Sequence, residues 1–266
     1  MLRITYVTIT YNAASVLQRT LDSVLSQDYP DILHLIIDGA STDDTMQLVD
    51  AYIDRSNAAD NGHSIQVTSE PDKGIYDAMN KGLRSLDGDY VCFLNAGDFL
   101  PSSDTVTRIV EKVNFQSSIF NFQSSNALPA VLYGDTDIVD GEGRFLHHRR
   151  LAPPEQLSWK SFRQGMLVCH QAFYARADFA IATPYDLRYR YSADVDWCIR
   201  VMKAAAKENV PLFNLKMVVA CYTQEGQTTL HHRESLLERY HVMEHHYGRL
   251  QTFFLHCWFA LRSLLK

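Results

Sequence analysis

The feature that most constrains this chain is the apolar run Tyr90–Leu94, which ends abruptly in an amide, a small residue, a glycine and a carboxylate. Gly88 precedes the run and Gly97 comes soon after it, so the pattern predicts a short strand buried on both faces inside a parallel sheet. In an open α/β sheet, loops at the carboxyl ends of the strands form the crevice that binds ligands. Asp98 would lie there as a hard oxygen ligand for Mg²⁺ or Mn²⁺, which in turn holds a diphosphate. The alternative is a plain turn, because Asn, Gly and Asp are common turn residues.

Strand and helix patterns alternate through the part of the chain that precedes this run. Three segments rich in apolar and β-branched residues read as strands: 4–9, 33–37 and 65–67. Apolar residues at helical spacing follow each of them, and Ser41 with Asp44 resembles a capping box at the start of the second helix. The alternation predicts an α/β fold with a Rossmann-like, mostly parallel central sheet, helices on both faces and a C-terminal helical extension. The glycine-rich dinucleotide fingerprint and the P-loop are both absent, so a bound nucleotide would depend on carboxylates and a metal.

Composition limits what this crevice belongs to. With 266 residues, 46% of them hydrophobic, the chain forms one large α/β domain, or one such domain with appendages. A net charge of −6 argues against a nucleic-acid partner, which would require a basic face. The five cysteines are scattered without a CxxC pair, which argues against a structural zinc site and favours a reduced, cytosolic protein. We expect a cytoplasmic protein without a signal peptide or a membrane-spanning segment.

Four segments of the first hundred residues, taken in their order and spacing, resemble a family 2 glycosyltransferase of the GT-A fold: 7–12, 38–43, 72–82 and 93–98. The resemblance implies that Thr10 and Asp38 contact the base and ribose of a nucleotide, and that Asp98 binds Mg²⁺ or Mn²⁺. A carboxylate suits that role, since it can accept a hydrogen bond from the imide of uracil. The resemblance implies further contacts to the nucleotide sugar from Asn12, Lys73, Asp77, Asn80 and Asn95.

The metal motif departs from the family pattern. Asn95 and Gly97 replace its first two acidic positions, and only Asp98 is retained. One carboxylate, two phosphate oxygens and waters can still complete the octahedral shell of Mg²⁺, so we expect weak metal binding without the donor. The same variant resembles a subgroup that acts in bacterial exopolysaccharide and colanic-acid-type assembly.

Two segments of the second half carry further candidate contacts. Residues 131–143 read as two strands joined by a tight turn after Asp135, which would either approach the sugar or only shape that turn. His170 and Gln171 interrupt an apolar run over 166–174, where a polar side chain needs a partner or a ligand. Two interpretations of His170 stay open: a buried, hydrogen-bonded side chain, or a contact to the donor phosphate or the acceptor, which the subgroup resemblance favours.

The second chemical stretch, Tyr191–Arg200, opens a helix with two carboxylates in its first turn, where the helix dipole stabilises anions. Helix capping alone would explain either carboxylate. By resemblance, Asp194 matches the general base of the family and Ala193 replaces the acid that usually precedes it, whereas Asp196 matches a less constant neighbour. A sugar hydroxyl is a poor nucleophile, so a carboxylate must accept its proton. One base and direct displacement, without an enzyme nucleophile, imply inversion at the anomeric carbon.

The chain closes with two helical patterns. The first, over 230–247, carries two pairs of adjacent histidines, including His245 and His246. Neighbours on a helix point about 100° apart, which favours solvated faces over a metal cluster. The second, over 250–266, is a broad apolar stripe with basic residues around it, which suits a helix lying in a membrane interface at the cytoplasmic face of the inner membrane. Packing on the domain or on a partner subunit is the equal alternative.

We therefore expect a GT-A domain over 1–225, with a nucleotide-sugar half (1–101) and an acceptor half (102–225), and a helical extension over 226–266. The expected activity is inverting transfer from a nucleotide-diphosphate sugar, with UDP favoured over GDP, to a saccharide or lipid-linked saccharide in bacterial surface polysaccharide synthesis. One alternative is a sugar nucleotidyltransferase, although the Gly-rich basic loop of that class is absent here. The other is a catalytically inactive nucleotide-sugar-binding module.

Overall fold

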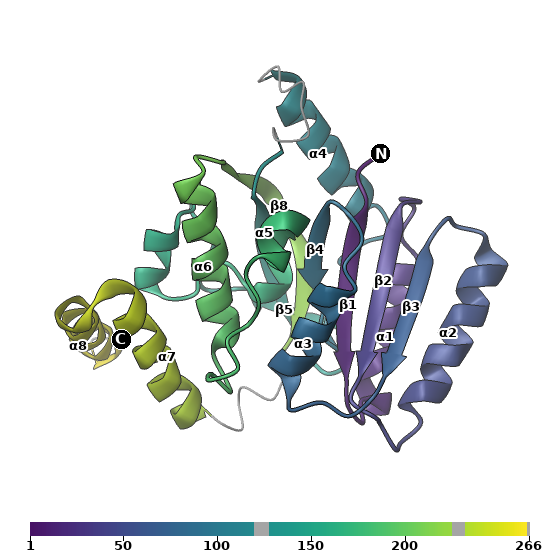
Figure 1. Ribbon diagram of the computed structural model, residues 1–266, viewed down its shortest axis with the longest axis horizontal. Coiled ribbons are helices and arrows are strands. Elements are labelled where there is room, and N and C mark those ends of the chain that lie inside the picture. The colour runs from purple at the N-terminus through teal and green to yellow at the C-terminus, as the bar shows by residue number, and fades with distance from the viewer. Residues whose placement is uncertain (120–127, 225–231, 265–266) are drawn as a thin grey trace.

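The computed structural model describes residues 1–119, 128–224 and 232–264 (Figure 1). The first half repeats a strand and a helix: β1 (Ile4–Thr10), α1 (Ala14–Leu25), β2 (Ile32–Asp38), α2 (Thr45–Ala59), β3 (Ser64–Ser69), α3 (Ile75–Arg84) and β4 (Tyr90–Phe93). The second half is less regular: α4 (Thr105–Ile119), β5 (Val131–Val139), β6 (Phe145–His148), the 3-10 helices η2 (Trp159–Gln164) and η3 (His170–Ala172), β7 (Phe173–Arg176), α5 (Ala177–Ile181), α6 (Ala193–Lys207) and β8 (Leu212–Thr223). The helices α7 (His232–Tyr247) and α8 (Arg249–Leu264) follow.

Within the described residues, eight strands form one sheet in the order β3-β2-β1-β4-β7-β5-β6, with β8 paired to β5. The strands β1 to β4 are parallel, and Thr10 lies opposite Asp38 where β1 and β2 end. β7 runs antiparallel to both β4 and β5, so β4 and β5 point the same way, and β8 runs parallel to β5. The expected mostly parallel sheet is confirmed, and the carboxyl ends of β1, β2, β4, β5 and β8 share one edge.

Helices cover both faces of the sheet, as expected (Figure 1). On one face, α1 and α2 pack together over β2, where Leu17, Ile36 and Tyr52 are buried. On the other face, α3 approaches β1 at Gly82, where an added Cβ would lie 2.6 Å from the Val7 side chain. This glycine therefore sets how closely the helix lies on the sheet.

The second half departs from the predicted elements at β5. This strand is continuous through Val139, and the predicted tight turn after Asp135 is wrong, because the pairing with β8 runs the length of the strand. The chain reverses later, where Asp140 accepts hydrogen bonds from the backbone N–H groups of Glu142 and Arg144. The pairing with β8 shifts register on either side of Asp135, an irregularity of the kind that re-aims side chains near functional sites.

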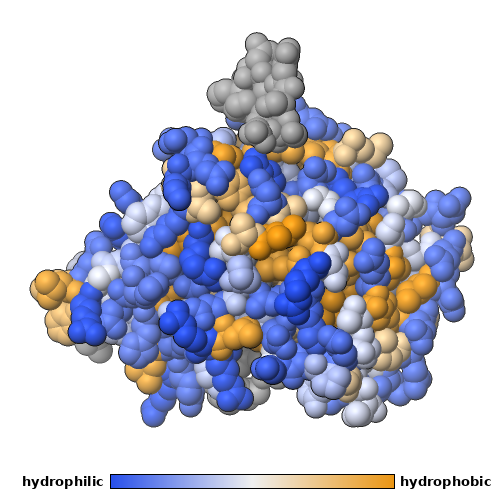
Figure 2. Space-filling view, viewed as in Figure 1, coloured by the Kyte–Doolittle hydropathy of each residue, from blue (hydrophilic) through white to orange (hydrophobic). Residues whose placement is uncertain are grey.

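Of the two C-terminal helices, α7 packs against α6 and α8 packs against α7 and η2, at the left of Figure 1. The Tyr247 ring stacks on Trp159 with centroids 5.8 Å apart, and the Tyr247 hydroxyl donates to the Trp159 carbonyl. One side of α8 turns toward the domain with Thr252, Leu255 and Phe259, whereas the other exposes between 54% and 78% of Leu250, Phe253, Phe254 and Trp258 (Figure 2). None of the helices in the described part of the chain is long and apolar enough to cross a membrane.

Candidate active site

Asp38, the last residue of β2, holds together the loops that follow β1 and β2. Its carboxylate accepts hydrogen bonds from the hydroxyls of Thr10 (2.9 Å), Ser41 and Ser69 (2.7 Å), and from the Ser41 N–H (2.9 Å). Burial alone would raise the pKa of Asp38, but these hydrogen bonds outweigh it and hold the pKa below its ordinary value. Asp38 is therefore ionised, and its hydrogen bonds hold the loops after β1 and β2 together, with Thr10 beside it.

Asn12 continues this interlocked arrangement in the loop after β1. Its φ of 49° lies in the left-handed region, its Oδ1 accepts the Thr42 N–H at 2.8 Å, and its own N–H donates to Ser41 Oγ at 2.8 Å. The expected capping box of Ser41 with Asp44 does not form, and α2 begins without a side-chain cap. The reason is that α2 begins at Thr45 rather than directly after Ser41, whose hydroxyl oxygen accepts the Asn12 N–H while its proton is donated to Asp38.

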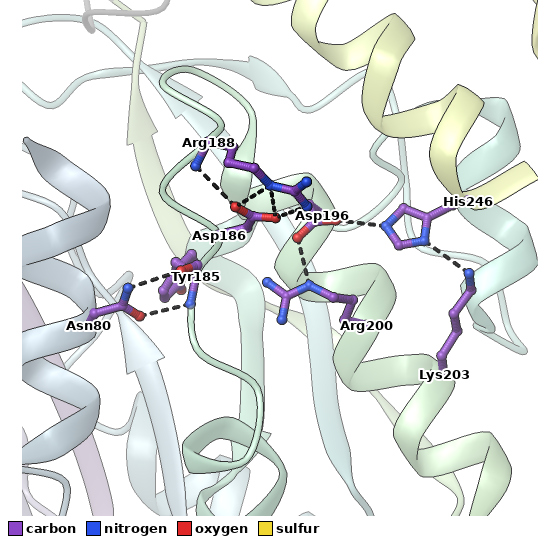
Figure 3. Close-up of polar contacts among 8 residues, drawn as sticks. All are labelled: Asn80, Tyr185, Asp186, Arg188, Asp196, Arg200, Lys203 and His246. Atoms are coloured by element: carbon purple, nitrogen blue, oxygen red, sulfur yellow. Dashed lines mark hydrogen bonds and ion pairs between the residues drawn. The ribbon is translucent and has the colours of Figure 1, made fainter.

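The three candidate residues on or next to α3, Lys73, Asp77 and Asn80, make different contacts. Lys73 is exposed, and its backbone N–H donates to the carboxylate of Asp77 at 3.0 Å. Asn80 is buried and binds the backbone of Tyr185 twice, through its amide nitrogen at 3.0 Å and its amide oxygen at 2.7 Å (Figure 3). Asn80 therefore anchors the segment that leads into α6, and Lys73 is left as the exposed cation.

Asp98 follows β4 and is only 5% exposed. Its carboxylate accepts a hydrogen bond from Gln171 Nε2 at 2.5 Å and another from the Thr223 N–H at 3.0 Å. Burial raises the pKa of Asp98 to about 7, although both hydrogen bonds oppose the shift. Nothing in the local sequence pairs Gln171 or Thr223 with Asp98. The only signal for Gln171 was its place inside an apolar run.

The turn that carries Asp98 offers a small set of oxygen ligands for a hard cation. The described residues contain no cluster of three His, Cys, Asp or Glu side chains able to hold a metal ion. In this turn, however, Asn95 Oδ1 is buried without a hydrogen-bond partner, and each Asp98 oxygen keeps a second lone pair. Two oxygen donors of this kind fit Mg²⁺ or Mn²⁺ when phosphate and water supply the other ligands. Gly97 has a φ of 97°, which explains why a side chain is missing there.

His170 lies in an aromatic cage behind this turn and is 4% exposed. Its ring stacks on Phe93 with centroids 5.3 Å apart, its Nε2 hydrogen-bonds the Tyr185 hydroxyl at 2.7 Å, and the Trp197 ring packs edge-on against it. Burial lowers the pKa of His170 to about 4, so the ring is neutral at physiological pH. Of the two interpretations of His170, this arrangement matches the buried, hydrogen-bonded side chain.

The two carboxylates of the first turn of α6 have opposite environments. Asp194 is half-buried, and the Tyr76 hydroxyl on α3 donates to its Oδ1 at 3.3 Å. Asp196 is 2% exposed and accepts hydrogen bonds from Arg200 Nε at 2.6 Å and His246 Nε2 at 2.8 Å (Figure 3). Burial would raise the pKa of Asp196, but these two partners hold it below its ordinary value. Asp194 can therefore meet a substrate, whereas Asp196 joins α6 to α7.

His246 corrects the expectation of solvated histidines. Its side chain is 3% exposed between Asp196 and Lys203, whose Nζ lies 2.9 Å from His246 Nδ1. His245 is exposed as expected, residue 231 lies outside the described residues, and nothing is described of the side chain at 232. A buried carboxylate on the neighbouring helix is the reason that one histidine of the pair turns inward.

Asp98 and Asp194 are far apart in the sequence but lie in one region of the fold. A series of contacts joins the two carboxylates. Gln171 donates to Asp98, and the neighbouring His170 hydrogen-bonds the Tyr185 hydroxyl. The Tyr185 ring stacks on Tyr76, whose hydroxyl donates to Asp194. The loops after β1 and β2, the Asp98 turn and the start of α6 thus meet on one edge of the sheet.

Comparisons with known proteins agree with this geometry. The family described as Glycosyl transferase family 2 matches residues 5–179. The chain is 31% identical over 218 residues to a PGL/p-HBAD biosynthesis glycosyltransferase of Mycobacterium bovis (strain BCG / Pasteur 1173P2), which covers 82% of this chain and 75% of that protein.

Two solved structures share the fold. S. aureus TarS 1-349 in complex with UDP-GlcNAc superposes with a TM-score of 0.64 at 14% identity, over 84% of this chain and 59% of that one. Glucosyl-3-phosphoglycerate synthase from Mycobacterium tuberculosis, in complex with Mn²⁺, UDP and glucosyl-3-phosphoglycerate, superposes with a TM-score of 0.56 at 14% identity, over 91% and 79%. The chain has the GT-A fold and belongs to glycosyl transferase family 2.

Proposed function

We propose that this chain is an inverting glycosyltransferase that moves a sugar from a nucleotide-diphosphate sugar to a hydroxyl group of a saccharide or lipid-linked saccharide. The observation that carries the proposal is the half-buried carboxylate of Asp194 at the start of α6, linked through Tyr76 and Tyr185 to the segment that holds Asp98. UDP is the favoured nucleotide and GDP the alternative. Two of the fold neighbours support UDP, since one is bound to UDP-GlcNAc and another to UDP, and a third, bound to GDP-Man, keeps GDP as the alternative.

Asp194 is the proposed general base. It would accept the proton of the acceptor hydroxyl while the oxygen attacks the anomeric carbon, a transfer that needs hydrogen-bond contact between carboxylate and hydroxyl. The Tyr76 hydroxyl orients the carboxylate from α3. Asp196 cannot share this role, because Arg200 and His246 occupy its two oxygens inside the protein.

The nucleotide sugar would bind at the loops after β1 and β2, which Asp38 holds together. Thr10, Asn12 and Asp38 form the proposed base and ribose side, with Asp77 fixing the backbone of the exposed Lys73 for the diphosphate. Mg²⁺ or Mn²⁺ held by Asp98 and Asn95 would offset the charge that the leaving diphosphate gains. Asn80 and His170 would act one layer further back, by fixing Tyr185 from two sides.

A cavity of about 280 Å³ supports an acceptor subsite in the second half of the chain. Its lining is mostly polar and charged, with two apolar residues: Asp135, Thr136, His148, Arg149, Ala152 and Val218. Burial raises the pKa of Asp135, which fits a carboxylate kept for a ligand hydroxyl rather than for solvent. Arg149 connects the cavity to the Asp98 region through the chain, since it donates to the carbonyls of Met166 and Leu167, which lie a few residues before Gln171.

We further propose a role in bacterial surface glycoconjugate synthesis, with peripheral contact at the cytoplasmic face of the membrane through α8. The name of the mycobacterial relative, a PGL/p-HBAD biosynthesis glycosyltransferase, supports the first part. The exposed apolar side of α8 supports the second part, since an amphipathic helix binds a membrane by burying its apolar face in the interface.

A screen of nucleotide sugars, read by released UDP or GDP with and without Mg²⁺ or Mn²⁺, tests the proposed activity. We expect release from a UDP sugar that rises when a saccharide acceptor is added. Formation of a nucleotide sugar from a sugar phosphate would instead identify a nucleotidyltransferase. Tight binding of nucleotide sugars without any release would identify an inactive binding module.

A further inference from the structure

Glu238 on α7 holds the chain segment that leads into α6. One carboxylate oxygen accepts the backbone N–H of Arg190 at 2.7 Å, and the other accepts those of Tyr191 and Ser192 at 2.6 Å each. Three consecutive amides therefore point at one carboxylate. Hydrogen bonds to an ionised acceptor are among the stronger ones in proteins, so this contact fixes the local backbone.

The same helix reaches the first turn of α6 at two more points. The Ser192 hydroxyl donates to the carbonyl of Ser235 at 3.2 Å, and Ser192 is fully buried. His246, about three turns further along α7, binds Asp196. Contacts from α7 thus fix the backbone two residues before Asp194 and the side chain two residues after it.

Side-chain contacts do little to fix Asp194 itself. Its contact with Tyr76 is a long hydrogen bond of 3.3 Å, which orients one carboxylate oxygen only weakly. The direction in which the carboxylate points therefore depends on the backbone of residues 192–196. That backbone is anchored by α7, which lies in the C-terminal extension outside the matched family region of 5–179.

We propose that Glu238 is a positioning residue for the catalytic base, and that α7 is part of the active centre rather than an appendage. The inference rests on the proposed function, since it assumes that Asp194 is the base. Removing the Glu238 carboxylate leaves three N–H groups without their acceptor, which frees the start of α6 to move. A displacement of about 1 Å at a reacting group can cost about 10²-fold in rate.

Glu238→Ala and Glu238→Gln, with Glu234→Gln as the matched control, test the inference. Glu234 lies one turn earlier on α7 and is exposed. We expect Glu238→Ala to lower kcat by about ten- to a hundredfold while the KM for the donor stays within about twofold. Glu238→Gln keeps one acceptor oxygen and should fall between Glu238→Ala and the wild type, and Glu234→Gln should match the wild type.

Hydrogen exchange of the 190–196 amides gives a readout that needs no substrate. It should speed up in both Glu238 variants and stay unchanged in Glu234→Gln, and Glu238→Gln serves if the alanine variant does not fold. Unchanged exchange, or wild-type kcat in Glu238→Ala, would overturn the inference. A wild-type protein that turns over no donor refutes the proposed function instead, and the exchange result then decides whether Glu238 fixes this segment at all.

Discussion

Replacing Asp194 with asparagine should remove catalysis and leave the fold and donor binding intact. Asparagine keeps the shape of the side chain and can still accept the hydrogen bond from Tyr76, but it cannot take up a proton at neutral pH. Loss of a general base typically costs about 10²–10⁴ in rate, which is about 2.7–5.4 kcal/mol on the activation barrier. Because Asp194 is half-buried and lightly bonded, the free energy of unfolding should hardly change.

Asp196→Asn is the matched control, since it makes the same chemical change two residues away. This side chain is 2% exposed and accepts hydrogen bonds from Arg200 and His246. Asparagine keeps one acceptor oxygen and loses the charge, so one partner is left unsatisfied and the free energy of unfolding should fall by about 1.5–3 kcal/mol. The kcat should fall much less than in Asp194→Asn.

Three measurements on both variants separate these effects: the rate of nucleotide release, donor affinity by calorimetry, and denaturant unfolding. The expected result is a crossed pattern, in which Asp194→Asn loses turnover at unchanged stability and Asp196→Asn loses stability at largely retained turnover. An inactive Asp196 variant beside an Asp194 variant near wild type would refute the assignment of the base.

Three further predictions concern metal, pH and the tail. Asp98→Ala should abolish the dependence of UDP affinity on Mg²⁺ or Mn²⁺, and calorimetry that finds the same metal-dependent affinity in the variant would count against the metal assignment. Stability should fall by about 1–2 kcal/mol between pH 7 and pH 5, because two buried histidines lose about 2–4 kcal/mol while the Asp98 carboxyl, whose pKa burial raises to about 7, returns about 2 kcal/mol as it takes up a proton in the folded chain. Burial lowers the pKa of His34 to about 3 and of His170 to about 4, so both stay neutral in the folded chain, whereas the unfolded chain protonates them below about pH 6.5. The stabilisation is complete above that pH and is lost as the pH falls, and equal urea midpoints at pH 7 and pH 5 would contradict it. Deleting 250–266 should reduce co-sedimentation with anionic liposomes and leave donor hydrolysis largely intact, and equal co-sedimentation of both proteins would rule out the membrane contact.

The nucleotide half of the fold could be predicted because its strands are buried on both faces. β4 is a continuous apolar run, whereas β1 mixes apolar residues with threonine and β2 is apolar except for His34 and Asp38. The observed ends of these strands differ from the predicted ones by at most one residue. The loops after them are polar, and parallel strands bring such loops to one edge, so Thr10 and Asp38 were expected together. The antiparallel β7 could not be found this way, because its four residues, Phe173–Arg176, continue an apolar run that shows no period.

The parts of the site that escaped prediction depend on partners far away in the sequence. Asn80 lies on the same helix as Asp77, and nothing local shows that its amide binds Tyr185, 105 residues away. His246 lies 50 residues from Asp196, and Glu238 lies 46 residues from Ser192. A single sequence carries the chemistry of such side chains but not their pairing, which is set when α6 and α7 pack together.

The left-handed backbone at Gly97 also limits how the metal turn can evolve. A Cβ at this position would meet Val16 at an ordinary contact distance of 3.5 Å, so space alone does not forbid an aspartate. The φ of 97° disfavours an aspartate, since a non-glycine residue there carries backbone strain of about 1–3 kcal/mol. A lineage that gained a second metal carboxylate at this position would first need a different turn, at the expense of the Asp98 N–H contact to the Asn95 carbonyl. Selection for tighter metal binding is therefore expected to act at other positions. A single substitution at position 97 cannot add a second metal carboxylate without straining the turn.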